Sequence, residues 1–298
     1  MSEHSHLTMS SPVWFITATS SGFGKAIALE ALQRGHKVIA TARNSSKLAE
    51  LKEAGAAVMD LDVTADDATL AAKLSEANAM HGKITHVVNA AGYILVGAIE
   101  EASQKEVFDQ YNTNVFGSFN IARAAAPYLR AAAAAAASKG IDTNTALANF
   151  GSLGSWRSGA GVAHYCSTKF AVTGLTEGLR EELKPFGIDV CVIEPGYTRT
   201  GFLRGSDHRI VTEKLLDEYQ GTETEKARGL MAAVDGNQPG DVDKCAKVIV
   251  DVLTRKGGRE VPVRLLTGSD AVEVVKGKCN ETLQLVSEWE EVSSSVMY

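Results

Sequence analysis

The sequence predicts an α/β fold, in which helices cover both faces of a doubly wound parallel sheet. Short apolar runs alternate with helix-forming segments along the chain, an order typical of parallel sheets built from right-handed crossovers. The first apolar run ends in a turn rich in glycine and serine, directly before a helix. The composition, 45% hydrophobic and 22% charged in 298 residues, is that of a globular chain with a large core.

The first half of the chain alternates strand and helix. Strands are predicted at Val13–Thr17, His36–Thr41, Ala57–Leu61 and Ile84–Asn89. Helices are predicted at Lys25–Arg34, which Gly35 ends, and around Lys47–Glu53. Two capping-box patterns predict further helix starts, Thr64 with Asp67 and Ser103 with Glu106, and the second opens a long helix through about Tyr111–Arg130.

The second half continues the same order. The seven alanines of Ala131–Ala137 are strong helix formers and extend the preceding helix. A polar loop over 138–145 should lie at the amino end of the strand that follows it. The remaining strands are expected at Ala146–Phe150, Ile188–Ile193 and Val261–Leu266, and the helices at Tyr165–Leu183, Asp241–Arg255 and Ser269–Glu290. The segment Thr198–Gln238 has no strong strand signal and is predicted to be a loop with one or two short helices.

The domain organisation is predicted to be simple. Residues 1–11 are polar and are expected to form a disordered tail, and residues 12–298 are expected to form a single domain. Segment 200–238 is expected to supply a loop and short helices of this domain. His4 and His6 lie in the tail, where two histidines are usually solvated, so no metal site is predicted.

Charge and cysteine content exclude several classes of protein. The formal net charge is −6 and no basic stripe stands out, which argues against a nucleic-acid partner. No apolar run approaches the ~20 residues of a membrane span. Four cysteines without a CxxC pair indicate a reducing compartment, so a cytoplasmic location is expected. Cys166 is interpreted as a small buried side chain.

The turn after the first strand has the composition of a phosphate-binding turn. It reads Thr17-Ala18-Thr19-Ser20-Ser21-Gly22-Phe23-Gly24. Small residues let the backbone approach a pyrophosphate, and the helix that follows offers unpaired N–H groups and the positive end of its dipole. Its place between a strand and a helix predicts a dinucleotide site of the Rossmann type.

A second pattern has the spacing of a proton-transfer site. Tyr165 and Lys169 are four residues apart at the start of a helix, so their side chains share one face. A nearby ammonium favours the phenolate form of a tyrosine, which can then exchange a proton with a substrate oxygen. Ser152 lies 13 residues before Tyr165, at the end of a predicted strand.

Together these motifs resemble the short-chain dehydrogenase/reductase family over about Val13–Val296. The family's turn reads Thr-Gly-x-x-x-Gly-x-Gly, and this chain departs from it at Ala18, where a glycine would serve the tight turn. Further segments match the family's cofactor-binding segments: Asp62-Val63 beside adenine, Asn89-Ala90-Ala91-Gly92 beside the adenosine, and Pro195-Gly196-Tyr197-Thr198 beside the nicotinamide. The C-terminal segment around Arg264 and Asp270 is similar to a branch that includes steroid-dehydrogenase-like enzymes and reductases of microbial secondary metabolism.

The resemblance implies roles for a catalytic tetrad of Asn114, Ser152, Tyr165 and Lys169. In the family, the asparagine helps to hold a water chain that reaches the lysine, and the lysine bonds the nicotinamide ribose. Gly151 stands where the family usually has a further serine, but that neighbour does not handle the proton. The resemblance also implies a homo-oligomer, a dimer or tetramer, paired through the helices that carry Asn114 and Tyr165.

The expected function is therefore that of an NADP(H)-dependent oxidoreductase acting on a carbonyl or secondary alcohol of a small organic substrate. NADP(H) is expected because Ala42 stands where NAD-specific sites place an acid, and Arg43 follows it. Segment 200–238 is expected to form the substrate-binding loop and helices. Four side chains suit a hydrophobic substrate or internal packing equally well: Trp156, Phe202, Leu203 and Tyr219. Two alternatives remain: a non-catalytic dinucleotide-binding sensor or scaffold, and an epimerase or dehydratase on the same fold.

Overall fold

Seven parallel strands form the central sheet of the computed structural model, which describes residues 11–141, 143–205 and 208–298. Their order across the sheet is β3 (Ala57–Asp60), β2 (Lys37–Ala42), β1 (Val13–Ile16), β4 (His86–Asn89), β6 (Thr145–Phe150), β7 (Ile188–Pro195) and β11 (Arg264–Thr267). Each neighbouring pair is parallel. The order runs outward in both directions from β1, so the predicted doubly wound sheet is confirmed.

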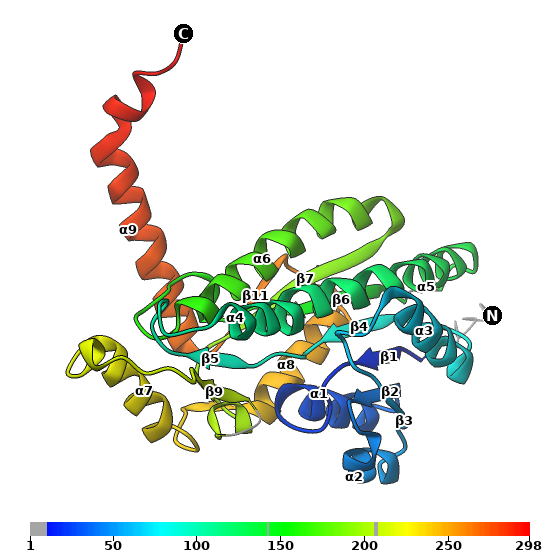
Figure 1. Ribbon diagram of the computed structural model, residues 1–298. Helices are drawn as coiled ribbons and strands as arrows, with labels where there is room; N and C mark the ends of the chain where they lie inside the picture. The colour runs from blue at the N-terminus through cyan, green and yellow to red at the C-terminus, as the bar shows by residue number, and fades with distance from the viewer. Residues whose placement is uncertain (1–10, 142, 206–207) are drawn as a thin grey trace.

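Helices cover both faces of this sheet (Figure 1). One face packs against α1 (Gly22–Gln33), α2 (Ala49–Glu53) and α8 (Val242–Leu253), and the other against α3 (Asp67–His81), α5 (Ser118–Ser138) and α6 (Ala163–Leu183). Strand β1 shows how the two cores form. Trp14 and Ile16 enter one hydrophobic cluster, whereas Val13 and Phe15 enter the other, because successive side chains of a strand point to opposite faces.

Of the two predicted capping boxes, one is confirmed and one is wrong. Ser103 caps α4 (Gln104–Tyr111) and exchanges hydrogen bonds with Glu106, as expected. The cap of α3 is Asp66, whose side chain accepts a hydrogen bond from the backbone N–H of Thr69 at 2.8 Å. Thr64 instead donates to the carboxylate of Asp62 through its backbone N–H and its hydroxyl. A side-chain acceptor was correctly expected at this helix start, but two residues too early.

The long helix predicted through 111–130 is divided by a π-helical turn. After α4, residues Asn112–Gly117 form that turn, and α5 then continues through the alanine run to Ser138. Such turns insert one extra residue and often lie at functional sites. Here the turn carries Asn114.

The prediction that segment 198–238 has no strands is wrong. Short strands form at β8 (Thr198–Arg199) and β9 (Arg209–Val211), which pair with β10 (Gly240–Asp241) and β5 (Ile94–Val96). The predicted short helix is α7 (Glu223–Ala233). Strands of two or three residues carry no periodicity, and their partners are distant in sequence, so the pattern of residues could not reveal them.

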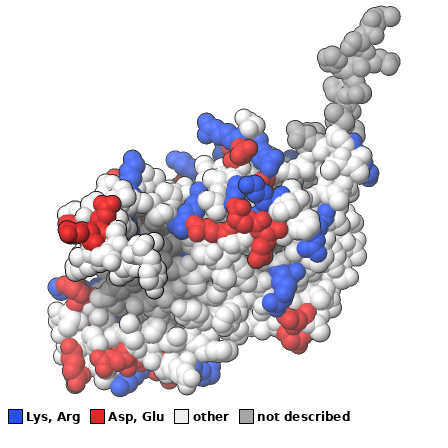
Figure 2. All heavy atoms as spheres, turned by 90° about the horizontal axis from the view of Figure 1, so that it is seen from above, with Lys and Arg blue, Asp and Glu red and all other residues white. Residues whose placement is uncertain are grey.

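The last helix, α9 (Ser269–Ser294), projects away from the rest of the molecule (Figure 1). In residues 11–298, apart from the three undescribed positions, no helix is long and apolar enough to cross a membrane. On the face seen in Figure 2, acidic and basic side chains are interspersed. Within the described chain no cluster of three or more His, Cys, Asp or Glu side chains could hold a metal ion. His4, His6 and all of the expected tail except Ser11 lie outside the described residues.

Candidate active site

A cavity of about 710 Å³ lies beyond the carboxyl ends of the sheet strands, where open α/β sheets bind their ligands. It brings together most of the residues predicted to bind the cofactor or to act in catalysis. Those that line it are Ala18, Ser20, Ser21, Gly22, Phe23, Gly24, Arg43, Asp62, Val63, Ala90, Gly92, Ser152, Tyr165, Lys169, Pro195, Gly196 and Thr198. Segments from six strand ends thus meet at one site.

Three predicted site residues lie behind this surface. The hydroxyl of Thr17 accepts a hydrogen bond from the backbone N–H of Ala90 at 3.0 Å. The side-chain amide of Asn89 donates to the carbonyl of Ser118 and to Asn149 Oδ1, both at 2.9 Å. In this structure Thr17 and Asn89 are buried and join β1, β4 and β6, so they shape the site from below.

The third is Asn114, which the π-helical turn directs at the segment after β4. Its Oδ1 accepts from the backbone N–H of Tyr93 at 3.0 Å, and its Nδ2 donates to the Tyr93 carbonyl at 2.9 Å. A Cβ at Gly92 would lie only 3.1 Å from Asn114 Oδ1 and 3.7 Å from Lys169 Nζ. Glycine at position 92 therefore lets the backbone pass close to both polar groups.

The phosphate-binding turn keeps a left-handed conformation in spite of Ala18. Ala18 has φ +54°, and Gly22 has φ +56°. A Cβ at Gly24 would lie 2.6 Å from the carbonyl oxygen of Ala18, a distance that real Cβ atoms do not reach. The turn and the start of α1 therefore pack backbone against backbone, which leaves the helix N-terminus open to the cavity.

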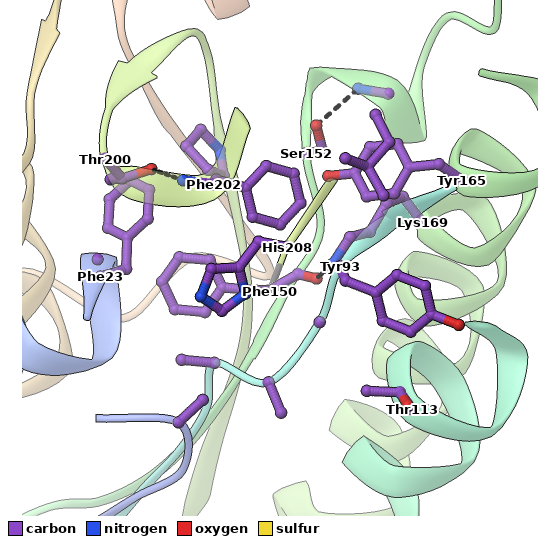
Figure 3. A pocket seen from close by; sticks show the side chains of 18 of the residues that line it. Phe23, Tyr93, Thr113, Phe150, Ser152, Tyr165, Lys169, Thr200, Phe202 and His208 are labelled. Carbon is purple, nitrogen blue, oxygen red and sulfur yellow. Dashed lines mark hydrogen bonds between the residues drawn. The ribbon is translucent and has the colours of Figure 1, made fainter. Parts of the chain in front are cut away.

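Ser152 and Tyr165 meet at the wall of the cavity (Figure 3). Their hydroxyl groups point toward each other. Burial raises the pKa of Tyr165, and the neighbouring Ser152 hydroxyl acts in the opposite direction. The Ser152 hydroxyl also accepts from the backbone N–H of Gly154 at 3.0 Å. The two hydroxyl oxygens are thus held where a third oxygen could form hydrogen bonds with both.

Lys169 lies one helical turn after Tyr165 and is almost completely buried. Its Nζ donates to the carbonyl of Phe150 at 2.7 Å and lies 5.7 Å from the centre of the Tyr165 ring. Burial lowers the pKa of Lys169 to about 8, because removing an ammonium from water disfavours its charged form. The amine therefore titrates close to neutral pH.

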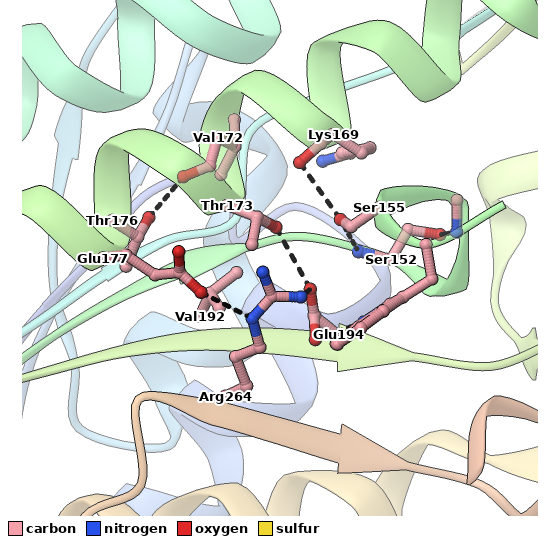
Figure 4. Close-up of polar contacts among 12 residues, drawn as sticks. Ser152, Ser155, Lys169, Val172, Thr173, Thr176, Glu177, Val192, Glu194 and Arg264 are labelled. Atoms are coloured by element: carbon pink, nitrogen blue, oxygen red, sulfur yellow. Dashed lines mark hydrogen bonds and ion pairs between the residues drawn. The ribbon is translucent and has the colours of Figure 1, made fainter. Parts of the chain in front are cut away.

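A buried carboxylate supports the loop that carries Ser152 (Figure 4). Glu194, fully buried on β7, accepts from Trp156 Nε1 at 2.9 Å and from the Thr173 hydroxyl at 3.1 Å, and it pairs with Arg264. The Arg264 guanidinium lies 4.1 Å from the centre of the Trp156 ring. Burial raises the pKa of Glu194, and these donors oppose that effect.

This packing explains why glycine stands at position 151, where the related family usually has serine. A Cβ at Gly151 would lie 2.9 Å from both Glu194 Cγ and Val192 Cγ2, and 3.0 Å from Ser155 Oγ. Ser155 accepts from the backbone N–H of Ser152 and donates to the carbonyl of Lys169. The space of the missing side chain is thus filled by groups that hold the loop that carries Ser152.

The far part of the cavity is mainly apolar. Of the four side chains proposed for substrate or packing, Phe202 and Leu203 line it. Trp156 instead packs on Arg264, and the Tyr219 hydroxyl donates to Glu100 at 2.6 Å. His208, Ile210 and Met231, which come from the segment 200–238 expected to bind substrate, also line it. Four further lining residues lie outside the expected site segments: Asp109, Thr113, Phe150 and Val274.

The contact that His208 makes with the turn after β1 was not predicted from the sequence. Its Nε2 lies 3.3 Å from the hydroxyl of Ser21, and its ring stacks on Phe202. The residue comes from the segment around β9, which is 187 positions away from Ser21. A single histidine in a region without a motif gave no signal of this contact.

The residues of the cavity fit a dinucleotide. Gly196 closely approaches Asp270, since a Cβ there would lie 2.0 Å from Asp270 Oδ1. The buried Oε1 of Gln238, which borders the cavity near Thr198, has no hydrogen-bond partner within the described part of the chain. An acceptor is thus free beside the segment that resembles a nicotinamide site, and the helix N-terminus of α1 is open at the other end.

Comparison with known proteins identifies the family. The family model described as short chain dehydrogenase matches residues 12–210. The chain is 34% identical to "Oxidoreductase BOA17" of Botryotinia fuckeliana, over 94% of this chain and 97% of that protein. It is 32% identical to the 3-ketodihydrosphingosine reductase of Bacteroides thetaiotaomicron, over 69% and 70%. The protein therefore belongs to the short-chain dehydrogenase family and is an oxidoreductase, which confirms the resemblance seen in its motifs.

Solved structures agree with this assignment. A short-chain dehydrogenase from Streptomyces avermitilis is 34% identical, with a TM-score of 0.84 over all of both chains. More distant neighbours share the fold alone. A Burkholderia phymatum protein in complex with NAD has a TM-score of 0.73 at 22% identity, covering 96% of each chain. A Sphingobium yanoikuyae protein in complex with NADPH has a TM-score of 0.65 at 23% identity, covering 93% of this chain and 95% of that one.

Proposed function

We propose that the protein is an NADP(H)-dependent oxidoreductase that moves hydride between the nicotinamide and a carbonyl or secondary alcohol of a small, hydrophobic substrate. The observation that carries the proposal is the pair of neighbouring hydroxyl groups of Ser152 and Tyr165 on the wall of one cavity with the turn of Ser20–Gly24. A non-catalytic sensor would need the turn, but it has no use for two hydroxyls aimed at a third oxygen.

Each side chain has a separate part in this proposal. A bound nicotinamide cofactor supplies or accepts the hydride. Ser152 donates a hydrogen bond to the substrate oxygen and stabilises the negative charge that develops on it. Tyr165 gives its proton to that oxygen during reduction and removes it during oxidation. Lys169, held on the Phe150 carbonyl, adds positive charge beside the phenol when it is protonated, and by family resemblance it bonds the cofactor ribose.

The positive charge is needed to lower the pKa of Tyr165. Burial alone raises it, so the phenolate that oxidation requires is rare at neutral pH without help. A protonated Lys169 and an oxidised nicotinamide both favour the phenolate. In the reductive direction the protonated phenol is already the reactive form.

The preference for NADP(H) is argued from the end of β2. Ala42 is buried and Arg43 is exposed on the cavity wall, so a 2′-phosphate there meets a guanidinium and no carboxylate at position 42. The nearby Asp60 carboxylate accepts from the backbone N–H of Ser45 at 2.6 Å, which lowers its pKa. Asp60 is not among the cavity-lining residues of the described chain.

Assembly and location complete the proposal. The elements that carry Asn114 and Tyr165 expose the large apolar side chains Phe116, Phe170 and Leu175, and Phe108 is exposed on the preceding α4, which supports a homo-oligomer formed through these elements. All four cysteines are free thiols, which supports a reducing, cytoplasmic location.

The test is turnover of a panel of apolar ketones with NADPH by the wild type and the Tyr165→Phe variant. We expect NADPH consumption by the wild type and a loss of kcat of about 10²–10⁴-fold in the variant, because the general acid is removed. The dissociation constant for NADPH should be nearly unchanged. Tyr219→Phe is the matched control, since that hydroxyl bonds Glu100 outside the cavity.

Two outcomes would contradict the proposal. Wild-type turnover in the Tyr165→Phe variant would show that the proton comes from another group. Tight NADPH binding without turnover of any ketone or alcohol would favour the alternative, a non-catalytic dinucleotide sensor or scaffold.

A further inference from the structure

One wall of the cavity is held in place mainly by polar contacts. We call residues 209–233, which comprise β9, a loop and α7, the lid. The lid supplies Ile210 and Met231 to the lining of the cavity. Of the residues of α7, all of which the structure describes, Thr224 alone is buried, and Figure 1 shows this helix at the edge of the molecule. Apolar burial alone therefore does little to fix the lid.

Three glutamates in the chain after β5 bind the lid. Glu106 Oε1 accepts a hydrogen bond from the backbone N–H of Glu213 at 3.0 Å. Glu100 Oε1 accepts from the Tyr219 hydroxyl at 2.6 Å. Both bonds are exposed, so water competes for the same groups and their net contribution is small. The third glutamate, Glu101, differs from these two because it is buried.

Glu101 joins the turn after β5 to two points of the lid. Its side chain is 0% exposed. Its Oε1 accepts from the backbone N–H of Leu216 at 3.0 Å. Its Oε2 accepts from the backbone N–H of Ala98 at 2.7 Å and from the Arg228 guanidinium. Burial raises the pKa of this carboxyl, but the guanidinium and the backbone donors outweigh burial and hold the pKa below its usual range.

Arg228 depends on Glu101 in turn and carries the contact to the cavity wall. Its side chain is 17% exposed, and its buried Nε has no hydrogen-bond partner within the described part of the chain. Arg228 and Met231 are three residues apart in α7, so they lie on the same face. Met231 packs in an apolar cluster that includes Tyr165 and Phe202. The helical turn that pairs with Glu101 thus also places a side chain beside the active site.

A close backbone contact couples α7 to the chain just before α6. A Cβ at Gly161 would lie 3.3 Å from both Ala227 Cβ and the carbonyl oxygen of Thr224. The Gly161 carbonyl also accepts from the backbone N–H of Gly97 at 2.9 Å. A shift of α7 would therefore disturb the segment that leads into the helix of Tyr165.

We propose that Glu101 is a positioning residue of the substrate site: by holding Leu216 and Arg228, it places Met231 in the cavity wall and so sets the affinity for an apolar substrate. This inference rests on the function proposed above. Glu101 is not among the cavity-lining residues of the described chain, so it acts through the lid and not by touching the substrate or the cofactor.

The test is steady-state kinetics with NADPH and an apolar ketone, together with the dissociation constant for NADPH from fluorescence titration. Glu101→Gln should raise KM for the ketone about tenfold while kcat changes by less than about threefold, because binding by the wall is lost and the proton-transfer groups are kept. The dissociation constant for NADPH should be unchanged. Loss of stability alone would lower the unfolding temperature without separating KM from kcat in this way.

Further variants test whether Glu101 acts through Arg228. Arg228→Met should raise KM as Glu101→Gln does, whereas Arg228→Lys keeps a cation for Glu101 and should stay close to the wild type. The double variant Glu101→Gln/Arg228→Met should resemble the worse single variant, because both changes remove the same contact. Glu218→Gln is the matched control, since it makes the same charge change at an exposed position of the lid.

Hydrogen exchange gives a second measurement that does not depend on turnover. Backbone amides of α7 should exchange about tenfold faster in Glu101→Gln than in the wild type, and those of β1 and β4 should be unchanged. An unchanged KM in Glu101→Gln, or a double variant with the product of the two single effects, would overturn the proposal. If the wild type turns over no ketone or alcohol, the proposed function fails instead, and equal exchange of α7 in the two proteins would then disprove the role of Glu101.

Discussion

At the scale of single residues, Ala18 places backbone strain in the phosphate-binding turn. The sequence indicated that alanine would disfavour this turn, and the structure shows that the turn is retained with Ala18 at φ +54°. A left-handed residue other than glycine costs about 1–2 kcal/mol. The strain persists because Gly24 packs directly beneath the Ala18 carbonyl and holds the backbone in place.

Ala18→Gly should therefore stabilise the protein by about 0.5–1 kcal/mol, since relief of the strain exceeds the extra entropy that glycine gives the unfolded chain. Urea unfolding at neutral pH measures this difference. Ala72→Gly, at an exposed position inside α3, is the control and should cost about 1 kcal/mol. A loss of stability in Ala18→Gly would mean that the turn is not strained.

At the scale of elements, the site depends on how the ends of strands are joined. Glu194 on β7 ties the loop after β6 to α6 and β11 through Trp156, Thr173 and Arg264. If this buried carboxylate were removed, all of its hydrogen-bond donors would be left without an acceptor. The position of Ser152 is therefore determined jointly by β7, α6 and β11.

The end of β2 is the element that decides the cofactor in our proposal. Ala42→Asp with Arg43→Gln introduces a carboxylate that repels a 2′-phosphate and removes the cation that holds it. The ratio of kcat/KM with NADPH to that with NADH should fall by at least tenfold in the double variant. Each single variant should show a smaller change, and Lys47→Gln, on the exposed turn that follows, serves as the control. A wild type that prefers NADH would refute the role of Arg43.

At the scale of the whole molecule, one buried histidine links the fold to pH. His86 on β4 lies fully buried, with its Nε2 3.1 Å from the Leu253 carbonyl and its ring 4.5 Å from that of Trp14. Burial lowers its pKa to about 4. The folded state therefore keeps His86 neutral at a pH where the unfolded chain, with a pKa near 6.5, has bound a proton.

The sign of this effect follows from the lowered pKa. The contribution of His86 is fully present above pH 6.5 and is lost as the pH falls toward 4, by at most about 3 kcal/mol. The free energy of unfolding of the wild type should thus fall more steeply between pH 6.5 and 4 than that of His86→Gln. Burial also lowers the pKa of His36 and His81, so the comparison between the two proteins isolates His86. Equal slopes would contradict the assignment.

The sequence by itself determined the sheet, the phosphate-binding turn and the offsets that join Ser152, Tyr165 and Lys169. The strands and the spacing of Tyr165 and Lys169 depend on burial and periodicity within short segments, which the sequence reports directly. The offset of Ser152 was recognised through the family resemblance. The doubly wound class followed because parallel crossovers allow few arrangements, whereas the order of the strands is seen only in the structure.

Only the tertiary structure decided which side chains line the cavity and what supports them. The pairing of β5 with β9, the contact of His208 with Ser21 and the filling of the space at Gly151 by Glu194 all join segments far apart in the chain. The cap of α3 moved to Asp66 because the carboxylate of Asp62 already holds Thr64. Such contacts depend on where distant segments meet in space, and that is information that local residue patterns do not contain.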